Sequence, residues 1–286
     1  MKKMFKGSGP TKCVQYIILT AMAIMMLFPL VYAFFSAFKT NTGLMAYPER
    51  LFPEKFMFSN IGKILNSDKI DVKRGFFNSL WFTSASVVIS LFLSSVCGYV
   101  FARGKFKGKK LLFMIFSALM FISMGPITIY PTLRIVSALR LEKSLAGLLV
   151  TRLFGIPVIE MYMVKGFIDS LPKALDESAK LDGCTFIGIL FKIIVPMLKP
   201  LLATLAILAF KSSWNEYITP AIYTMTAPKQ QTMMVQIMAL KNSGQGASDW
   251  TLLFMAAIIM VIPVLVIFII FNKQITESVT SGAIKG

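Results

Sequence analysis

The sequence of 286 residues contains no histidine and only three cysteines. Without an imidazole, the chain cannot form a serine–histidine or cysteine–histidine catalytic pair, and most zinc chemistry is also excluded. Cys13, Cys97 and Cys184 lack the spacing of metal ligands, and nothing in their positions implies a disulfide framework. We therefore expect no metal site and no catalytic site, and the chain is predicted not to be an enzyme.

Acidic residues are also scarce: 13 Asp and Glu face 30 Lys and Arg, which gives a net charge of +17. The basic residues flank apolar segments and form no surface interleaved with exposed aromatics, so we expect no nucleic-acid partner. Attraction to negatively charged membrane lipids and the positive-inside rule explain the excess of basic residues better than a nucleic-acid partner does. The stretch 104–110 has the order G-x-x-x-G-K-K and lacks the spacing and the Ser/Thr of a phosphate loop, so this chain is predicted to bind no nucleotide or other cofactor.

Long apolar runs dominate the sequence, which is 56% hydrophobic with a mean hydropathy of +0.71. Residues 13–38, 75–102, 111–133 and 250–272 contain no Asp, Glu, Lys or Arg. About 20 apolar residues in a helix cross a bilayer, so each run is long enough. The segments 146–167 and 201–222 have a similar length but carry embedded charges. We predict an all-α polytopic membrane protein that forms a single domain, 1–286. Its six transmembrane helices are expected at about 14–38, 76–102, 111–133, 146–167, 201–222 and 251–271.

The basic residues also predict the orientation of these helices. Residues 103–110 hold five basic residues and no acid, so this loop is assigned to the inside. Six spans then place both termini and the loop 171–200 in the cytoplasm. The first apolar run is too long for the core of a signal peptide, and we expect an uncleaved anchor. The polar segment 39–77 is expected to lie along the outer surface.

The loop 171–200 has the pattern of two short helices around a glycine turn. Ser170 is a candidate N-cap and Pro172 suits the first helical turn. Gly183 can adopt φ > 0 and end the first helix, and Pro196 is expected to break a second helix that begins near Thr185. Taken alone, this pattern also describes an ordinary solvated helix–turn–helix.

The spacing within this loop resembles the EAA loop, the signature of permease subunits of binding-protein-dependent ABC importers. Ser178 and Cys184 stand where that motif has alanine, and Val195 stands where it has leucine, but the spacing is kept. The positions that match the motif, and that the resemblance implies contact an ATPase, are Glu177, Ser178, Ala179, Asp182, Gly183, Ile193 and Pro196.

The resemblance extends beyond the loop, from about residue 14 to residue 286. The segments 78–80, 124–131, 214–216 and 282–286 are similar to the smaller permease subunit of carbohydrate importers of the maltose-transporter type. This resemblance implies a type I ABC importer permease fold in a bacterial plasma membrane. The implied partners are a second permease subunit, two ATPase subunits that use the ATP, and an extracytoplasmic sugar-binding protein. It also implies an ATPase-interface tail, made of Ser281, Gly282, Lys285 and Gly286.

Ionisable and aromatic residues within the predicted spans are candidates for the translocation pathway. Glu160 lies two helical turns from Arg152, and ionisable groups at this depth usually face the bundle or water. Trp214, Asn215 and Glu216 could stack on or hydrogen-bond a sugar, or instead anchor the helix at the interface and bond a neighbouring helix. Arg152 could equally extend to the outer interface.

Two other functions remain to be compared with the importer hypothesis. An ion-coupled secondary transporter would need mid-membrane carboxylates and inverted repeats, and the sequence has Glu160 and Glu216 but no visible repeat. An intramembrane enzyme is disfavoured by the absence of histidine and of paired intramembrane carboxylates. The sequence does not specify which sugar is carried.

Overall fold

The computed structural model describes residues 9–68, 70–121, 125–242 and 249–283, and within these ranges the chain is helical with no strand. The predicted all-α class is confirmed. The contacts divide the chain into two compact units. Unit 1 comprises Met1–Val72 and Ile237–Val261, and unit 2 comprises Lys73–Gln236 and Ile262–Gly286. The single membrane domain stays a prediction.

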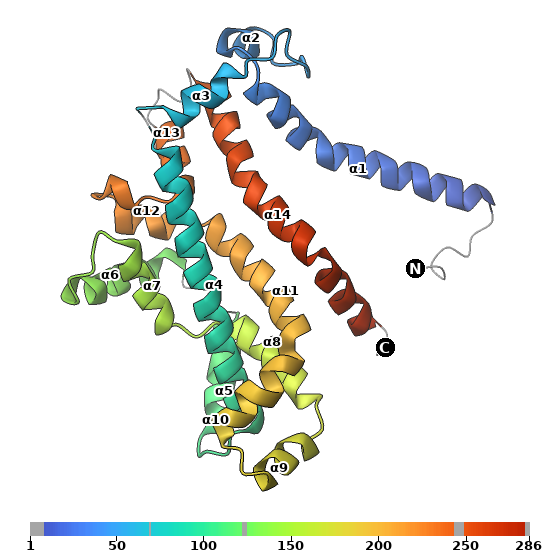
Figure 1. The fold of residues 1–286 in the computed structure, drawn as a ribbon, viewed down its shortest axis with the longest axis vertical. Helices are drawn as coiled ribbons and strands as arrows, with labels where there is room; N and C mark the ends of the chain where they lie inside the picture. Colours follow the sequence, from blue (N-terminus) through green and yellow to red (C-terminus); the bar gives the residue numbers. More distant parts are fainter. Residues whose placement is uncertain (1–8, 69, 122–124, 243–248, 284–286) are drawn as a thin grey trace. The chain divides into compact units, whose positions relative to one another are not determined.

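Four described helices are long and apolar enough to cross a membrane (Figure 1). They are Lys12–Ala37 within α1 (Gly9–Ala37), α4 (Val72–Arg103), Phe186–Trp214, and Trp250–Phe271 within α14 (Trp250–Ala283). A fifth candidate is the pair α7 (Leu145–Leu153) and α8 (Val158–Asp169), which bends by 41° at the intervening break. The predicted third span is divided among α5 (Lys109–Leu119), η1 (Gly125–Thr128) and α6 (Ile129–Ala138). Six spans are compatible with these helices but are not confirmed.

Unit 1 is built from α1, α2 (Asn41–Ala46), α3 (Ser59–Leu65), the end of α13 (Met233–Asn242) and the first half of α14. Asn60 fixes the chain after α1, because its buried side-chain amide donates to the carbonyls of Ala37 and Lys39, each at 2.9 Å. The apolar part of the segment 39–77 closes an aromatic cluster at the same place. Its members are Phe34, Phe35, Phe38, Phe52, Phe56 and Phe58.

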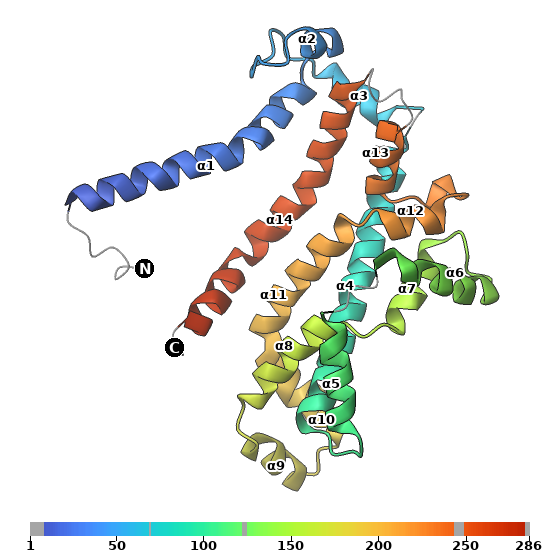
Figure 2. The ribbon, with the colours of Figure 1, turned by 180° about the vertical axis from the view of Figure 1, so that it is seen from behind.

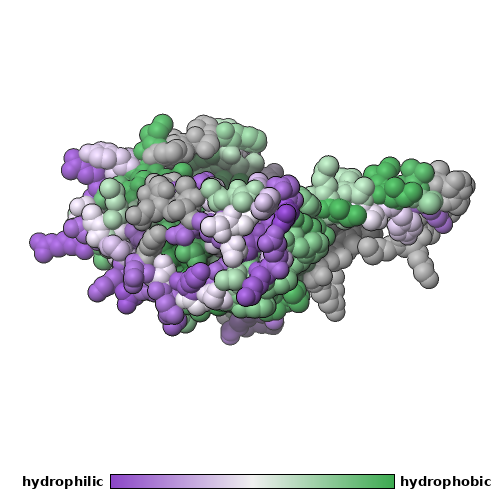
Figure 3. Space-filling view, turned by 90° about the horizontal axis from the view of Figure 1, so that it is seen from above, coloured by the Kyte–Doolittle hydropathy of each residue, from purple (hydrophilic) through white to green (hydrophobic). Residues whose placement is uncertain are grey.

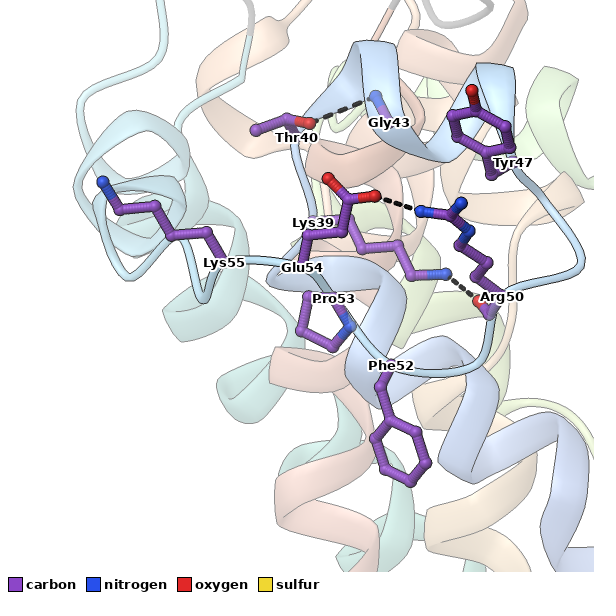
Figure 4. A pocket seen from close by; sticks show the side chains of 9 residues that line it. All are labelled: Lys39, Thr40, Gly43, Tyr47, Arg50, Phe52, Pro53, Glu54 and Lys55. Atoms are coloured by element: carbon purple, nitrogen blue, oxygen red, sulfur yellow. Dashed lines mark hydrogen bonds and ion pairs between the residues drawn. The ribbon is translucent and has the colours of Figure 1, made fainter.

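A small pocket of about 90 Å³ lies beside this cluster (Figure 4). The buried Lys39 ammonium donates to the backbone carbonyl of Arg50, and the Arg50 guanidinium pairs with Glu54. Burial lowers the pKa of Lys39, and the nearby Glu49 opposes that change. The basic groups of this pocket therefore stabilise the turn after α1.

The helix α1 presents mostly apolar side chains to its surroundings, and within its candidate span, Lys12–Ala37, the buried residues are Ser36 and Ala37 at its end (Figure 3). A soluble protein would bury such a surface, whereas a bilayer is itself an apolar solvent. This exposure agrees with a membrane-spanning helix.

In unit 2, α4 contacts two groups of helices along its length. Phe82 packs with Val136, Leu145, Leu148 and Tyr223 from α6, α7 and α12 (Ile218–Thr224). A second core gathers around Tyr99, near the end of α4, and includes residues of α8, α9 (Ala174–Leu181) and α10 (Phe186–Ile189). Both ribbon views show α6 and α7 beside the middle of α4, with α9 and α10 at its far end (Figures 1 and 2).

The helix after the loop differs from the prediction, because Pro196 does not end it. Thr185 caps α10 by accepting from the Gly188 N–H at 3.1 Å, and a π turn, Leu190–Ile194, then leads into α11 (Val195–Trp214). In the π turn the Val195 N–H bonds to the Leu190 carbonyl, five residues back. This wider turn comes directly before Pro196, which has no N–H, so the helix continues where an α-helix would lose a bond. The predicted span 201–222 is thus shifted to Phe186–Trp214.

Candidate functional site

The helix α9 carries the centre of the predicted coupling motif. It begins at Ala174, so the predicted capping by Ser170 is wrong. Ser170 instead ends α8, where its hydroxyl donates to the Phe167 carbonyl at 2.7 Å. Gly183 does end α9, as predicted, with a φ of 81° that a side chain would disfavour.

Asp176 holds α9 to the end of α4. Its carboxylate accepts from the Arg103 Nε–H at 2.9 Å and from the Tyr99 hydroxyl at 3.2 Å. The Arg103 and Asp176 side chains are only 8% and 7% exposed, so the ion pair is shielded from water. A second guanidinium nitrogen of Arg103 donates to the Leu171 carbonyl at 2.8 Å. One arginine therefore fixes both the loop before α9 and the first turn of α9.

Glu177, the next residue, has the opposite environment. Its side chain is exposed, and Leu181, one turn further along α9, is 89% exposed. An acid and a large apolar residue one turn apart on an exposed helix face form a surface suited to a protein partner. The partial positive charge at the start of α9 also favours the Glu177 carboxylate.

The remaining motif positions divide between core and surface. Ala179 is 4% exposed and belongs to the core around Tyr99, so only a small residue fits there. Ile193 is half-buried against the same core. Ser178, Asp182 and Pro196 are exposed. The structure therefore places the motif positions 177–183 on one short helix and the turn that follows it, with one face anchored and the other exposed, while Ile193 lies in the π turn and Pro196 at the start of α11.

Basic side chains lie around the end of α4 to which α9 is anchored. The Lys109 ammonium donates to the carbonyls of Ala102 at 3.3 Å and Gly104 at 3.0 Å, which satisfies the end of α4. Burial lowers the pKa of Lys109, nearby Lys165 lowers it further, and Asp169 opposes the change. The cluster predicted to face the cytoplasm thus lies beside α9.

A cleft of about 300 Å³, with polar side chains set in a largely apolar lining, lies elsewhere in unit 2, between α4, the break from α7 to α8, and α11. The helix is interrupted between Arg152 and Glu160, so these residues do not share one continuous helix as the sequence predicted. Both nevertheless line the cleft. Its lining residues are Ser86, Ile89, Ser90, Leu93, Arg152, Gly155, Ile156, Pro157, Glu160, Ala209, Ser212 and Ser213.

The side chain of Arg152 links α7 to the end of α11, so it is not the unpaired side chain, directed to the outer membrane interface, that the sequence also allowed. Its guanidinium pairs with Glu216, donates to the Ser213 hydroxyl at 3.0 Å, and lies 4.8 Å from the centre of the Phe82 ring. Sequence reasoning singled out both charged residues but missed that they pair. Their opposite charges within two predicted spans were the available signal.

Trp214 and Asn215 do not line this cleft. Trp214 is 1% exposed and packs on Phe210 and Phe76, with ring centres 5.4 Å and 5.8 Å away. Asn215 donates its side-chain amide to the Lys211 carbonyl at 2.9 Å and so caps α11. Their role in the pathway stays a prediction.

Two other predictions concern the tail and metal sites. Ser281 and Gly282 belong to the last turn of α14, while Lys285 and Gly286 lie outside the described residues. Among the residues that the structure describes, no three potential metal ligands cluster.

Known proteins resemble the chain along almost its full length. The permease protein SmoH of a sulfoquinovosyl glycerol transport system, from Agrobacterium fabrum, is 28% identical over 96% of this chain and 94% of its own. The permease protein AraQ of an arabinooligosaccharides transport system, from Bacillus subtilis, is 27% identical over 93% of this chain and 92% of its own.

The fold also matches a solved structure, a bacterial ABC transporter involved in the import of the acidic polysaccharide alginate. The TM-score is 0.77 at 21% identity, and the match covers 92% of this chain and 95% of the solved one. A family model, described as the inner membrane component of binding-protein-dependent transport systems, matches residues 90–281. This match includes α9 and its anchor on α4, and the chain therefore belongs to the family of binding-protein-dependent transport system inner membrane components.

Proposed function

We propose that this chain is the permease subunit of an ATP-driven carbohydrate importer, that it forms half of the sugar pathway, and that it couples to a separate ATPase through α9. The observation that carries the proposal is the division of α9 into two faces. Asp176 is buried and bonded to α4, while Glu177 is exposed beside Leu181. A helix held rigidly on one side can pass a movement of its exposed side to the membrane helices, which a flexible loop could not do.

The carbohydrate assignment is supported by the relatives, whose names refer to a sulfoquinovosyl glycerol and to arabinooligosaccharides. The partners of the proposed assembly are a second permease subunit, two ATPase subunits and an extracytoplasmic sugar-binding protein. ATP binds to the ATPase subunits and not to this chain. We place the assembly in a bacterial plasma membrane, with both termini and Gly183 in the cytoplasm and with the tail of α14 at the ATPase interface.

The substitution Glu177→Ala tests the coupling role. We expect it to abolish sugar uptake and to weaken capture of the ATPase subunit, because the docked carboxylate would lose its partner. A loss of only about 1.4 kcal/mol in docking would lower the affinity about tenfold. Uptake by cells and pull-down of the ATPase measure the two effects.

Asp169→Ala is the matched control, because Asp169 is also an exposed acid and, within the described residues, forms its ion pair with Lys165 on its own helix. Equal losses in both variants would point to general damage, and normal uptake with Glu177→Ala would falsify the coupling role.

An ion-coupled secondary transporter is the second candidate, and the carboxylate of Glu160 in the cleft is the observation that favours it. Such a protein would need no ATPase. Uptake that survives inactivation of the partner ATPase but stops when the ion gradient is collapsed would support this function over the importer.

A further inference from the structure

The cleft in unit 2 offers hydrogen-bonding groups that its own structure does not use. Ser90 and Ser212 line it, and neither hydroxyl has a hydrogen-bond partner within the described part of the chain. The Ser86 hydroxyl donates to the Phe82 carbonyl at 2.7 Å and keeps its lone pairs for a ligand. Apolar residues complete the lining. Hydroxyls spaced along an apolar wall suit a ligand that is itself rich in hydroxyls.

The two charged residues of the lining differ in how their charges are compensated. The charge of Arg152 is balanced by Glu216, and its other contacts go to Ser213 and to the ring of Phe82. The Glu160 side chain makes no hydrogen bond or ion pair in the part of the chain that the structure describes. It stands in the first turn of α8, where the helix dipole favours a carboxylate. The cleft therefore carries one uncompensated negative charge.

We propose that this cleft is a saccharide subsite that selects neutral sugars and repels uronates, with Glu160 as its specificity-determining residue. The inference rests on the proposed function and adds the charge class of the substrate. Glu160 and the serines accept and donate hydrogen bonds to sugar hydroxyls. A carboxylate on the sugar would meet the Glu160 charge in a confined space of low polarity, where like charges repel more strongly than in water. The relatives do not decide this point, since they include an importer of an acidic polysaccharide.

The field in the cleft can be measured directly with charged thiol reagents. Ser90→Cys and Ser212→Cys are introduced separately into the purified transporter complex, with Cys13, Cys97 and Cys184 replaced. The rates of modification by a cationic and an anionic methanethiosulfonate are each divided by the rate with a free thiol. We expect the cationic reagent to be favoured. Glu160→Gln should lower the ratio of cationic to anionic rates at least about fivefold, which is the change for unit charges about 8 Å apart in water and a lower bound for a less polar cleft.

Protection by saccharides tests the ligand class in the same variants. Arabinotriose and galactotriose are the neutral probes and trigalacturonate is the anionic probe. A neutral probe should slow the modification of the cysteine introduced at position 90 or 212 while trigalacturonate does not, and Glu160→Gln should allow trigalacturonate to protect as well. Glu142→Gln removes an equal charge from an exposed turn outside the cleft and should change neither result.

Three results would each overturn the proposal: a ratio of rates that Glu160→Gln leaves unchanged, protection by trigalacturonate equal to that by the neutral probes before the substitution, or no protection by any of the three saccharides. The measurement uses no ATP hydrolysis. Its failure is thus distinguishable from failure of the importer function, which Glu177→Ala tests through uptake and ATPase capture.

Discussion

Replacing Asp176 by asparagine would test whether the anchored face of α9 is needed for coupling. The substitution keeps the size of the side chain but removes its charge, so Arg103 remains as an unpaired cation that is only 8% exposed. Removing one partner of a buried ion pair costs about 3–5 kcal/mol. The single amide oxygen can still accept from Arg103, and the amide nitrogen can donate to the Tyr99 hydroxyl, so we expect a cost near the lower end of that range. The contact of Arg103 with the Leu171 carbonyl does not depend on Asp176 and should hold the preceding loop in place.

The cost falls on the contact between α9 and α4, and so it should appear as a loss of coupling. In reconstituted transporter, Asp176→Asn is expected to lower sugar uptake at least tenfold while ATP hydrolysis falls much less, which raises the number of ATP molecules used per sugar imported. Asp169→Asn is the control, because its exposed pair with Lys165 on one helix contributes only about 0.3–0.5 kcal/mol. Exchanging the partners, with Arg103→Asp and Asp176→Arg together, should recover part of the coupling.

The result that would refute this reasoning is an unchanged ratio of ATP to sugar in Asp176→Asn. Equal losses of uptake and hydrolysis, together with a lower yield of folded protein, would assign the pair to stability alone. Arg103→Lys keeps the positive charge and should raise the ratio of ATP to sugar less than Asp176→Asn does. It should still raise this ratio, since a lysine ammonium cannot reproduce the planar fork that reaches Asp176 and the Leu171 carbonyl together.

Two further predictions follow from glycines. Gly98→Ala should destabilise the purified subunit by about 1–3 kcal/mol and lower its melting temperature. The added Cβ would lie 2.5 Å from Val164 Cγ1 and would push α8 away from α4. An unchanged melting temperature would show that the close packing of α8 on α4 at this glycine is not constrained. Gly183→Cys, in a chain without its natural cysteines, should react with an impermeant thiol reagent only after cells are opened, and labelling of intact cells would contradict the cytoplasmic position of the loop.

Much of the fold could be predicted because transmembrane helices obey a simple rule of length and polarity. The charge-free runs became α1, α4 and α14, and the glycine at 183 has the positive φ that its place after a helix predicted. The run 111–133 has the same composition but lacks a single continuous helix in the described residues, since composition does not specify where Gly125 and Pro126 interrupt the chain. Pro196 was predicted to end a helix that in fact continues through it. The π turn that accommodates this proline depends on packing of Leu190 and Ile194 in the core, which local sequence does not specify.

The candidate site shows the same limit. The motif spacing singled out Glu177 as a coupling residue, which stays a prediction, but it did not show that the neighbouring Asp176 is buried against α4. Which of two adjacent acids points into the protein is decided by Tyr99 and Arg103, which lie more than seventy residues earlier in the chain. Likewise, Arg152 and Glu216 could be identified as unusual residues from sequence, but their pairing depends on how α7 meets the end of α11.

The bend between α7 and α8 has a consequence for how this chain inserts into a membrane. Neither α7, with 9 residues, nor α8, with 12, spans a bilayer alone at about 1.5 Å per residue. The break between them interrupts the helical hydrogen bonding that lipid cannot replace, whereas α1, α4 and α14 are continuous helices. The segment should therefore leave the insertion machinery late, after α11 has been synthesised and can shield it. Ribosome-stalled chains ending before α11 should keep this segment in contact with the translocation channel, while chains ending after α12 should release it.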